Sequence, residues 1–330
     1  MSIVLGFESS CDETGVAVVK DGRRVLANEI ASQIDIHKVF GGVVPEIASR
    51  QHTRVISQLT RQALDAAATP VEAIDAIAAT QGPGLMGSLL VGLSFAKALA
   101  FSWNKPFVPV HHIEGHLFSA FLGERAPEFP FLALIVSGGH TQIVQCDRPH
   151  HYEILGATRD DAVGESFDKV ARLLDLPYPG GPSIQDAAKN GDPAAYDFPR
   201  SMRSKGNLEF SYSGLKTAVL YALKEGGDGI NIADVAASFQ AAAIDILIIK
   251  TRQAIAQTGA KRLVIAGGVA ANRLLRERAQ SGLGIEVFLP PFEYCIDNGA
   301  MIAAAADSLL QHGRTSDFTV TPNPSLALCP

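Results

Sequence analysis

Short apolar runs separated by polar turns open the chain and predict a strand meander. Ile3–Phe7 and Val16–Val19 are apolar enough for buried strands, and Arg23–Glu29 continues the pattern. The turn between the first two strands, Glu8–Gly15, contains the acidic pair Asp12 and Glu13. A strand, a polar turn and a returning strand suit a loop whose backbone N–H groups face a phosphate, although a plain hairpin has the same pattern.

After these strands, the spacing of apolar residues changes to that of a helix. Pro45 favours a helix start, and apolar residues every third or fourth position predict its core face. Ala76–Thr80 reads as a strand, and the Gly82–Gly87 turn opens a second helix before the strand Phe107–Val110. The turn has the form G-x-G-x-x-G. The dinucleotide fingerprint also needs an acidic residue about 20 positions later, and the next strand ends in histidines instead.

The same order of elements returns in the second half of the chain. Leu132–Val136 is a strand, Ser137–Thr141 a turn and Gln142–Gln145 a returning strand, and Leu263–Ala266 later leads through a glycine turn into a helix. This indicates a divergent internal duplication. The two turns of the first half, at Ser9 and Gly82, are 73 residues apart, whereas Ser137 and Gly268 are 131 apart. We therefore predict an N-terminal lobe at 1–130 and a C-terminal lobe at 131–330, with an insert at about 152–216.

Composition narrows the class of protein. The chain has 330 residues, is 47% hydrophobic and carries a net charge of −6, so no overall field attracts nucleic acid. The four cysteines, Cys11, Cys146, Cys295 and Cys329, form no C-x-x-C pair, which favours a reducing cytoplasm and excludes a zinc ribbon. The most apolar stretch, Gly84–Phe101, contains Lys97 and is explained better by a buried helix than by a membrane span.

The sequence HHIEGH, after the strand that ends at Val110, is the strongest chemical signal. His112 and His116 are four residues apart, so on a helix they share one face and can bind one metal ion. Two hydrogen-bonded core histidines are the alternative. A zincin needs Glu directly after the first histidine, and Glu114 is one position too far, which disfavours a metalloprotease. A third ligand must come from elsewhere; Asp297, before a C-terminal helix, is a candidate, although an aspartate there is usually a helix cap.

Ten segments together carry a closer resemblance. They are similar, in order, to motifs of the TsaD (Gcp) family of bacterial tRNA threonylcarbamoyladenosine synthases, and the resemblance runs from about Gly6 to about Ala306: ESSCDETG, HKVFGGVVPEIASRQH, GPGLMGSLLVG, HHIEGH, LIVSGGHTQIV, GESFDKVARLL, PGGPSI, FSYSGLKTA, AGGVAANRLLR and IDNGAMIA. It implies an α/β fold of two duplicated actin-like lobes (the ASKHA, ribonuclease H-like architecture) with a cleft between them.

The family's site residues are carried over motif by motif. The resemblance implies one divalent metal ion, iron or zinc, on His112, His116 and Asp297. It places a substrate loop on Ile135, Val136, Ser137, Gly138 and Gly139, and further nucleotide contacts on Asp168, Gly181 and Asn272. We assign Asp12 or Glu13 to positioning or deprotonating the acceptor amine. In two places the chain departs from the pattern: archaeal relatives have a tyrosine ligand at Ile135, and many relatives have an acid at Gln185.

The implied reaction is a metal-dependent acyl transfer. A threonylcarbamoyl group moves from threonylcarbamoyl-AMP to the exocyclic amine of adenosine 37 in tRNAs that read ANN codons. The implied partners are tRNA, the paralogue TsaB and the ATPase TsaE, with the donor supplied by TsaC or Sua5, in the cytoplasm and without a membrane. A small-molecule kinase of the same architecture is the main alternative, and it would not need the histidine pair. A non-catalytic scaffold is another.

Overall fold

The computed structural model describes residues 1–202, 204 and 206–329. By internal contacts the chain forms two compact units. The first comprises 1–127, 149–151 and 290–330, and the second comprises 128–148 and 152–289. The C-terminal segment therefore packs with the N-terminal unit. Contact-based units and the boundary of a duplication are different criteria, so the expected division at residue 130 stays a prediction.

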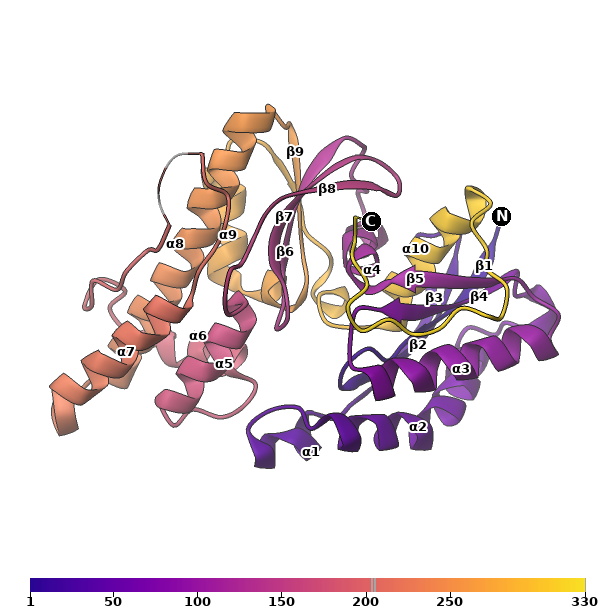
Figure 1. Ribbon diagram of the computed structural model, residues 1–330, viewed down its shortest axis with the longest axis horizontal. Helices are drawn as coiled ribbons and strands as arrows, with labels where there is room; N and C mark the ends of the chain where they lie inside the picture. The colour runs from indigo at the N-terminus through magenta and orange to yellow at the C-terminus, as the bar shows by residue number, and fades with distance from the viewer. Residues whose placement is uncertain (203, 205, 330) are drawn as a thin grey trace. The chain divides into compact units, whose positions relative to one another are not determined.

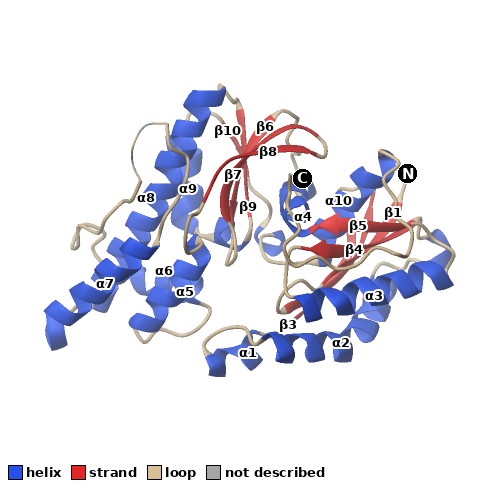
Figure 2. Ribbon diagram, in the orientation of Figure 1, coloured by secondary structure: helices blue, strands red, loops and turns tan. Residues whose placement is uncertain are grey.

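The first unit is built on a five-stranded sheet in the order β3-β2-β1-β4-β5 (Figures 1 and 2). β1 pairs antiparallel with β2 and parallel with β4, and β4 is parallel to β5. The central strands are apolar on both faces because helices cover both. This confirms the expected meander. The strands are β1 (Ile3–Glu8), β2 (Glu13–Lys20), β3 (Arg24–Ser32), β4 (Ala76–Gly82) and β5 (Phe107–His111).

Two pairs of helices complete this unit. α2 (Pro45–Ala66) and α3 (Met86–Ser102) pack on each other and on the sheet, while α4 (His112–Ser119) packs on α10 (Gly299–Gln311). Glycines bring α10 against the sheet. A Cβ on Gly15 would lie 2.5 Å from the Gly299 nitrogen, and a Cβ on Gly6 would lie 2.6 Å from the Gly299 oxygen. This close contact fixes the start of α10 over β1 and β2.

The second unit repeats the sheet strand for strand, in the order β10-β9-β6-β7-β8. β6 pairs antiparallel with β7 and parallel with β9, as β1 does with β2 and β4. The duplication expected from the turns is therefore visible in the topology, although the sequence analysis missed β8. The strands are β6 (Phe131–Val136), β7 (Thr141–Arg148), β8 (His151–Ala157), β9 (Arg262–Ala266) and β10 (Glu286–Phe288).

The two units differ most between the third and fourth strands. Residues 33–75 join β3 to β4, whereas residues 158–261 join β8 to β9, so the connection in the second unit is the longer one. The expected insert at about 152–216 stays a prediction. This connection contains α5 (Val163–Leu173), α6 (Gly180–Ala187), α7 (Ser213–Gly226) and α8 (Ile232–Thr258), and α9 (Arg273–Gly282) follows β9.

The longest helix, α8, has no counterpart in the sequence analysis. Within the described residues it is the one helix long and apolar enough to cross a membrane, but 72% of its apolar window is buried inside the protein. Val235, Phe239 and Ile244 are each 0% exposed. We therefore describe α8 as a core helix, whose all-round apolar surface reflects contacts on every side.

Two irregular segments also have defined structure. Residues 38–42 follow the one-turn helix α1 (Ile34–His37) and contain a short 3-10 turn. The segment from Arg314 is tied to the first unit by backbone contacts. Ser316 N–H donates to the Phe107 oxygen at 2.9 Å, and Asn323 N–H donates to the Gln81 oxygen at 2.9 Å. The C-terminal segment is thus part of the fold.

Candidate metal centre and its surroundings

The first histidine of HHIEGH fixes the start of helix α4. His111 is its N-cap, and its Nδ1 accepts a hydrogen bond from the Ile113 N–H at 3.1 Å, while its Nε2 donates to the Leu326 oxygen at 3.1 Å. Burial lowers the pKa of His111 to about 4. A neutral imidazole is what this arrangement needs, because one nitrogen accepts and the other donates. His111 therefore orients the helix and anchors the C-terminal segment.

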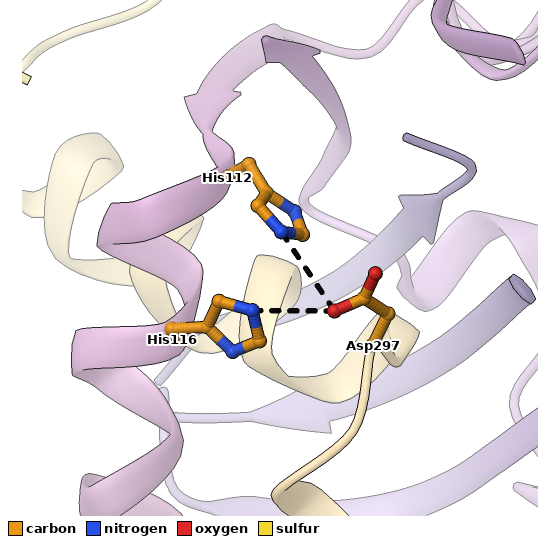
Figure 3. Close-up of side chains that lie close together, drawn as sticks. All are labelled: His112, His116 and Asp297. Carbon is orange, nitrogen blue, oxygen red and sulfur yellow. Dashed lines mark ion pairs between the residues drawn. The ribbon is translucent and has the colours of Figure 1, made fainter. Parts of the chain in front are cut away.

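His112, His116 and Asp297 converge on one point (Figure 3). Asp297 Oδ1 lies 3.2 Å from His116 Nε2 and 3.7 Å from His112 Nε2. A tetrahedral ion with bonds of about 2.0–2.1 Å has ligand atoms about 3.3 Å apart, so these separations suit one ion between the three side chains. Asp297, the candidate third ligand, thus lies beside the histidine pair.

Asp297 is not the cap of helix α10. The neighbouring residue, Asn298, is the N-cap, and its Oδ1 accepts from the Met301 N–H at 2.9 Å. The ordinary structural explanation for an aspartate at this position therefore does not apply. The Asp297 carboxylate instead faces the two imidazoles, and it is positioned by a helix start that the glycine contacts hold against the sheet.

The environment of His116 supports a ligand at this point. The residue is 0% exposed, and within the described part of the chain neither of its ring nitrogens has a hydrogen-bond partner. Leaving a buried polar group unsatisfied costs about 1–3 kcal/mol, so such groups are rare in folded proteins. A metal bond at Nε2 would satisfy one of these two ring nitrogens. The donor set, two imidazoles and a carboxylate, is one that binds divalent transition metals and leaves coordination positions open.

Glu8 is a functional residue that the sequence analysis missed. This carboxylate, 1% exposed, lies at the end of β1, and its Oε2 is 3.1 Å from His112 Nδ1 and accepts from Thr80 Oγ1 at 2.7 Å. A carboxylate on the far nitrogen fixes the tautomer that presents Nε2 to a metal. A signal was available, because β1, β4 and β5 are parallel and their carboxyl ends meet at one edge of the sheet.

The charges around His112 favour a positive occupant. Burial alone lowers the pKa of this imidazole, but the nearby carboxylates of Asp297 and Glu8 raise it to about 9. The metal-free side chain is therefore protonated at neutral pH, and a metal ion has to displace that proton. The same negative field that holds the proton stabilises a dication more strongly, because the interaction grows with charge.

Glu114 has a different role from that of a protease base. It is 6% exposed, and its Oε1 lies 2.6 Å from His150 Nδ1. On helix α4 it is two positions from each histidine ligand, and so on the opposite face. The geometry agrees with the argument from spacing against a metalloprotease.

The acidic pair in the first turn separates into two environments. Asp12 is partly exposed, whereas Glu13 is buried, and its Oε1 accepts from Ser32 Oγ at 2.7 Å on the neighbouring strand. Burial, with Asp12 close by, raises the pKa of Glu13 to about 8, although the Ser32 hydrogen bond acts in the opposite direction. Glu13 is therefore less readily ionised than an exposed glutamate.

In the second unit, the predicted substrate loop contains both buried and exposed residues. Ile135 and Val136 are 0% exposed in the core of the sheet, so their side chains contact no ligand. Ser137 closes the turn: its N–H donates to the His140 oxygen at 2.8 Å, and its Oγ accepts from the His140 N–H at 3.1 Å. The Ser137 N–H is thus already used within the turn. Gly138 and Gly139 are exposed, and a Cβ on either would meet nothing within 4 Å.

The remaining predicted contacts lie at helix starts. Asp168 Oδ1 accepts from the Gly180 N–H at 2.7 Å, at the start of α6, and Gly181 is open on its Cβ side. Asn272 is the N-cap of α9, where its Oδ1 accepts from the Leu275 N–H at 3.1 Å, and its Nδ2 donates to Gln240 Oε1 at 2.8 Å.

Gln185 also caps α9, because its Oε1 accepts from the Arg273 N–H at 2.8 Å. In this structure the side chains of Asn272 and Gln185 therefore have structural partners, which a ligand would have to share or displace.

Comparison with known proteins gives one family. The family model described as "tRNA N6-adenosine threonylcarbamoyltransferase" matches residues 24–304. The protein of that name from Kosmotoga olearia is 52% identical over 328 residues, covering 98% of both chains.

Two solved structures share the fold at low identity. The (R)-2-hydroxyglutaryl-CoA dehydratase component A of Acidaminococcus fermentans aligns with a TM-score of 0.57 at 15% identity, covering 93% of this chain and 98% of its own. Full-length HypF, in its phosphate- and nucleotide-bound form, aligns with a TM-score of 0.64 at 15% identity, covering 94% of this chain and 47% of its own. Both agree with two duplicated actin-like α/β lobes.

Proposed function

The chain belongs to the TsaD family of tRNA N6-adenosine threonylcarbamoyltransferases, and we propose that His112, His116 and Asp297 bind the divalent ion that organises its reaction. The enzyme transfers a threonylcarbamoyl group to the N6 amine of adenosine 37 in tRNA. The observation that supports the metal proposal most strongly is the convergence of two imidazoles and a carboxylate on a buried point where His116 has no other partner. Iron and zinc both suit this donor set.

The reaction is an acyl substitution with a poor nucleophile and a good leaving group. The adenosine amine attacks the carbonyl carbon of threonylcarbamoyl-AMP, the bond to the phosphate oxygen breaks, and AMP leaves with the electron pair. When bound, the metal ion supplies Lewis-acid charge that orients the donor and offsets the developing negative charge. The protein's own contribution is a fixed donor geometry: Glu8 holds His112, and His111 holds the helix.

We assign the donor nucleotide to the turns of the second unit. The Gly138 and Gly139 N–H groups are the phosphate donors in this proposal, since Ser137 is committed to closing the turn. The exposed glycines allow an anion to approach the backbone closely. Ile135 and Val136 then contribute only by positioning the turn. Asp168, Gly181 and Asn272 serve the adenosine end of the donor, through helix starts that favour anions and hydroxyl groups.

We assign to Asp12 the task of positioning or deprotonating the acceptor amine. A base has to be accessible to the amine, and Asp12 is partly exposed whereas Glu13 is buried. Glu13 then serves the strand pair β2–β3 through Ser32.

A complex is the working form in this proposal. A net charge of −6 is unfavourable for binding tRNA alone, because phosphate contacts dominate such affinity. We therefore propose that this chain binds tRNA in a complex with the paralogue TsaB and the ATPase TsaE. TsaC or Sua5 supplies threonylcarbamoyl-AMP in this proposal. A cytoplasmic location fits the tRNA substrate and the four free cysteines.

The assignment is tested by incubating the chain, with and without its partner proteins, with threonylcarbamoyl-AMP and unmodified tRNA. Nucleosides are then analysed by mass spectrometry. Threonylcarbamoyladenosine should accumulate over many turnovers only in the complete mixture. Robust multiple turnover by the isolated chain would refute the requirement for a complex, and the absence of product from the complete mixture would refute the assigned reaction.

A further inference from the structure

His150 lies outside every motif considered so far, yet its ring is almost completely buried beside the metal-bearing helix. Its side chain is 2% exposed, and it belongs to the same compact unit as α4 and α10. Its backbone has a φ of 63°, in the left-handed region that non-glycine residues rarely adopt. A residue held in this conformation is fixed by its surroundings, so its contacts show what it is fixed against.

On one side, the ring contacts two successive turns of helix α4. Nδ1 lies 2.6 Å from Glu114 Oε1, and the ring stacks on Phe118 with centroids 6.0 Å apart and an interplanar angle of 12°. Glu114 and Phe118 are four residues apart and share one face of the helix. His112 and His116 lie on the other face. His150 therefore supports α4 from directly behind the two metal ligands.

On the other side, the ring contacts the last turn of helix α10 and its C-cap residue, His312. Nε2 lies 3.1 Å from Ser308 Oγ, and the His312 ring meets His150 edge-on, with centroids 5.2 Å apart. Ser308 and His312 are again four residues apart. Helix α10 is the element that Asp297 immediately precedes. One imidazole thus joins the helix that carries two ligands to the helix that fixes the third.

We propose that His150 is a positioning residue of the metal site. By bridging α4 and α10 it holds His112 and His116 at the distance from Asp297 that one ion requires. The role rests on the metal proposal above and adds a residue that touches neither metal nor substrate. Groups that orient metal ligands typically change metal affinity about 10–100-fold when removed.

The test measures zinc affinity by competition with a chromogenic chelator, and needs no catalysis. His150→Gly removes the ring while the new residue accepts the left-handed backbone. We expect its dissociation constant for zinc to rise at least about tenfold in protein that remains folded by circular dichroism. The matched control is His151→Ala, an exposed histidine on the same hairpin, which should bind zinc as the wild type does.

A purely structural role would lower the melting temperature of His150→Gly and leave zinc affinity unchanged, and that result would overturn the proposal. If His150→Gly does not fold, Ser308→Ala decides the question, because alanine is well tolerated in a helix. It removes one contact of the bridge and should weaken zinc binding a few-fold; unchanged affinity would refute the bridge. Wild-type protein that binds no zinc or iron would instead refute the metal site itself.

Discussion

Replacing Glu8 by Gln should weaken metal binding without removing a ligand. The substitution keeps the volume of a fully buried side chain but removes the charge that lies 3.1 Å from His112 Nδ1. It also places an amide where two oxygens now accept hydrogen bonds from Thr80 and from the Ser10 N–H. We expect the dissociation constant for zinc or iron at pH 7 to rise about 10–100-fold, or about 1.4–2.7 kcal/mol.

The effect of Glu8→Gln on metal affinity should depend on pH, and the direction of that dependence follows from the pKa of His112. In the wild-type protein the carboxylates of Asp297 and Glu8 overcome the effect of burial and raise the pKa of His112 to about 9, so metal has to displace a proton at every pH below that value. Wild-type affinity should therefore rise by about an order of magnitude between pH 7 and pH 8.5 from this proton alone. In Glu8→Gln the pKa of His112 is lower, proton competition is weaker and the rise should be smaller. The deficit of the variant is thus larger at pH 8.5 than at pH 7.

The assay is chelator competition at the two pH values, with metal content checked by atomic absorption. Thr80→Val is the matched control, because it removes a hydrogen bond to Glu8 and leaves the charge beside His112. The control should show a smaller loss of affinity than Glu8→Gln and keep the wild-type pH dependence. Equal affinities for wild type and Glu8→Gln, or a parallel rise with pH in both, would refute the role given to Glu8.

Three further predictions concern the assigned residues. Replacing His112 and His116 together by Ala should remove the metal ion, as measured by metal analysis; wild-type metal content would show the site to be misassigned. Asp297→Asn should abolish metal binding, measured by metal analysis. Asn298→Ala should retain the metal and lose about 1 kcal/mol of stability, measured by denaturant unfolding, because it removes the cap of α10. Loss of metal in Asn298→Ala with retention in Asp297→Asn would contradict the division between the two residues. Gly138→Val should abolish binding of the adenylate. Metal content and melting temperature should stay unchanged, since a Cβ at this position meets nothing within 4 Å. Normal adenylate binding by this variant would show that the turn is not part of the active site.

Much of the fold was predictable because its signals are local. Apolar runs of the length of a buried strand, separated by polar or glycine turns, located β1 to β7 and β9. β8 was missed because its residues alternate weakly and several are exposed. Helix α8 was missed because it is apolar on every side and offers no amphipathic stripe to detect.

The metal group illustrates a different limit. Two histidines at helical spacing were a local signal, but the third ligand is 181 residues from His116, and no local pattern separates Asp297 from a helix cap. The structure separates them because Asn298 caps the helix. Glu8 could have been inferred from strand order alone. His150 could not, because its role depends on a hairpin tip packing between two helices.

In the substrate turn, residues that the family motif groups together have different roles in the structure. The motif marks Ile135 to Gly139 as a unit, whereas the structure buries the first two residues and uses Ser137 to close the turn. Only the two exposed glycines retain N–H groups suited to an anion. Hydrogen bonding within a turn depends on its backbone angles, which a motif does not state.

The proposed mechanism requires one ion on His112, His116 and Asp297 for transfer. This requirement is tested by stripping the enzyme of metal with a chelator and adding iron or zinc back in measured steps. At each step, single-turnover formation of threonylcarbamoyladenosine is measured in the presence of the partner proteins. We predict negligible product at zero metal and a rate that rises linearly with occupancy to a plateau at one ion per chain. A stripped enzyme that forms product at the rate of the metal-loaded enzyme would show that the reaction does not need the ion.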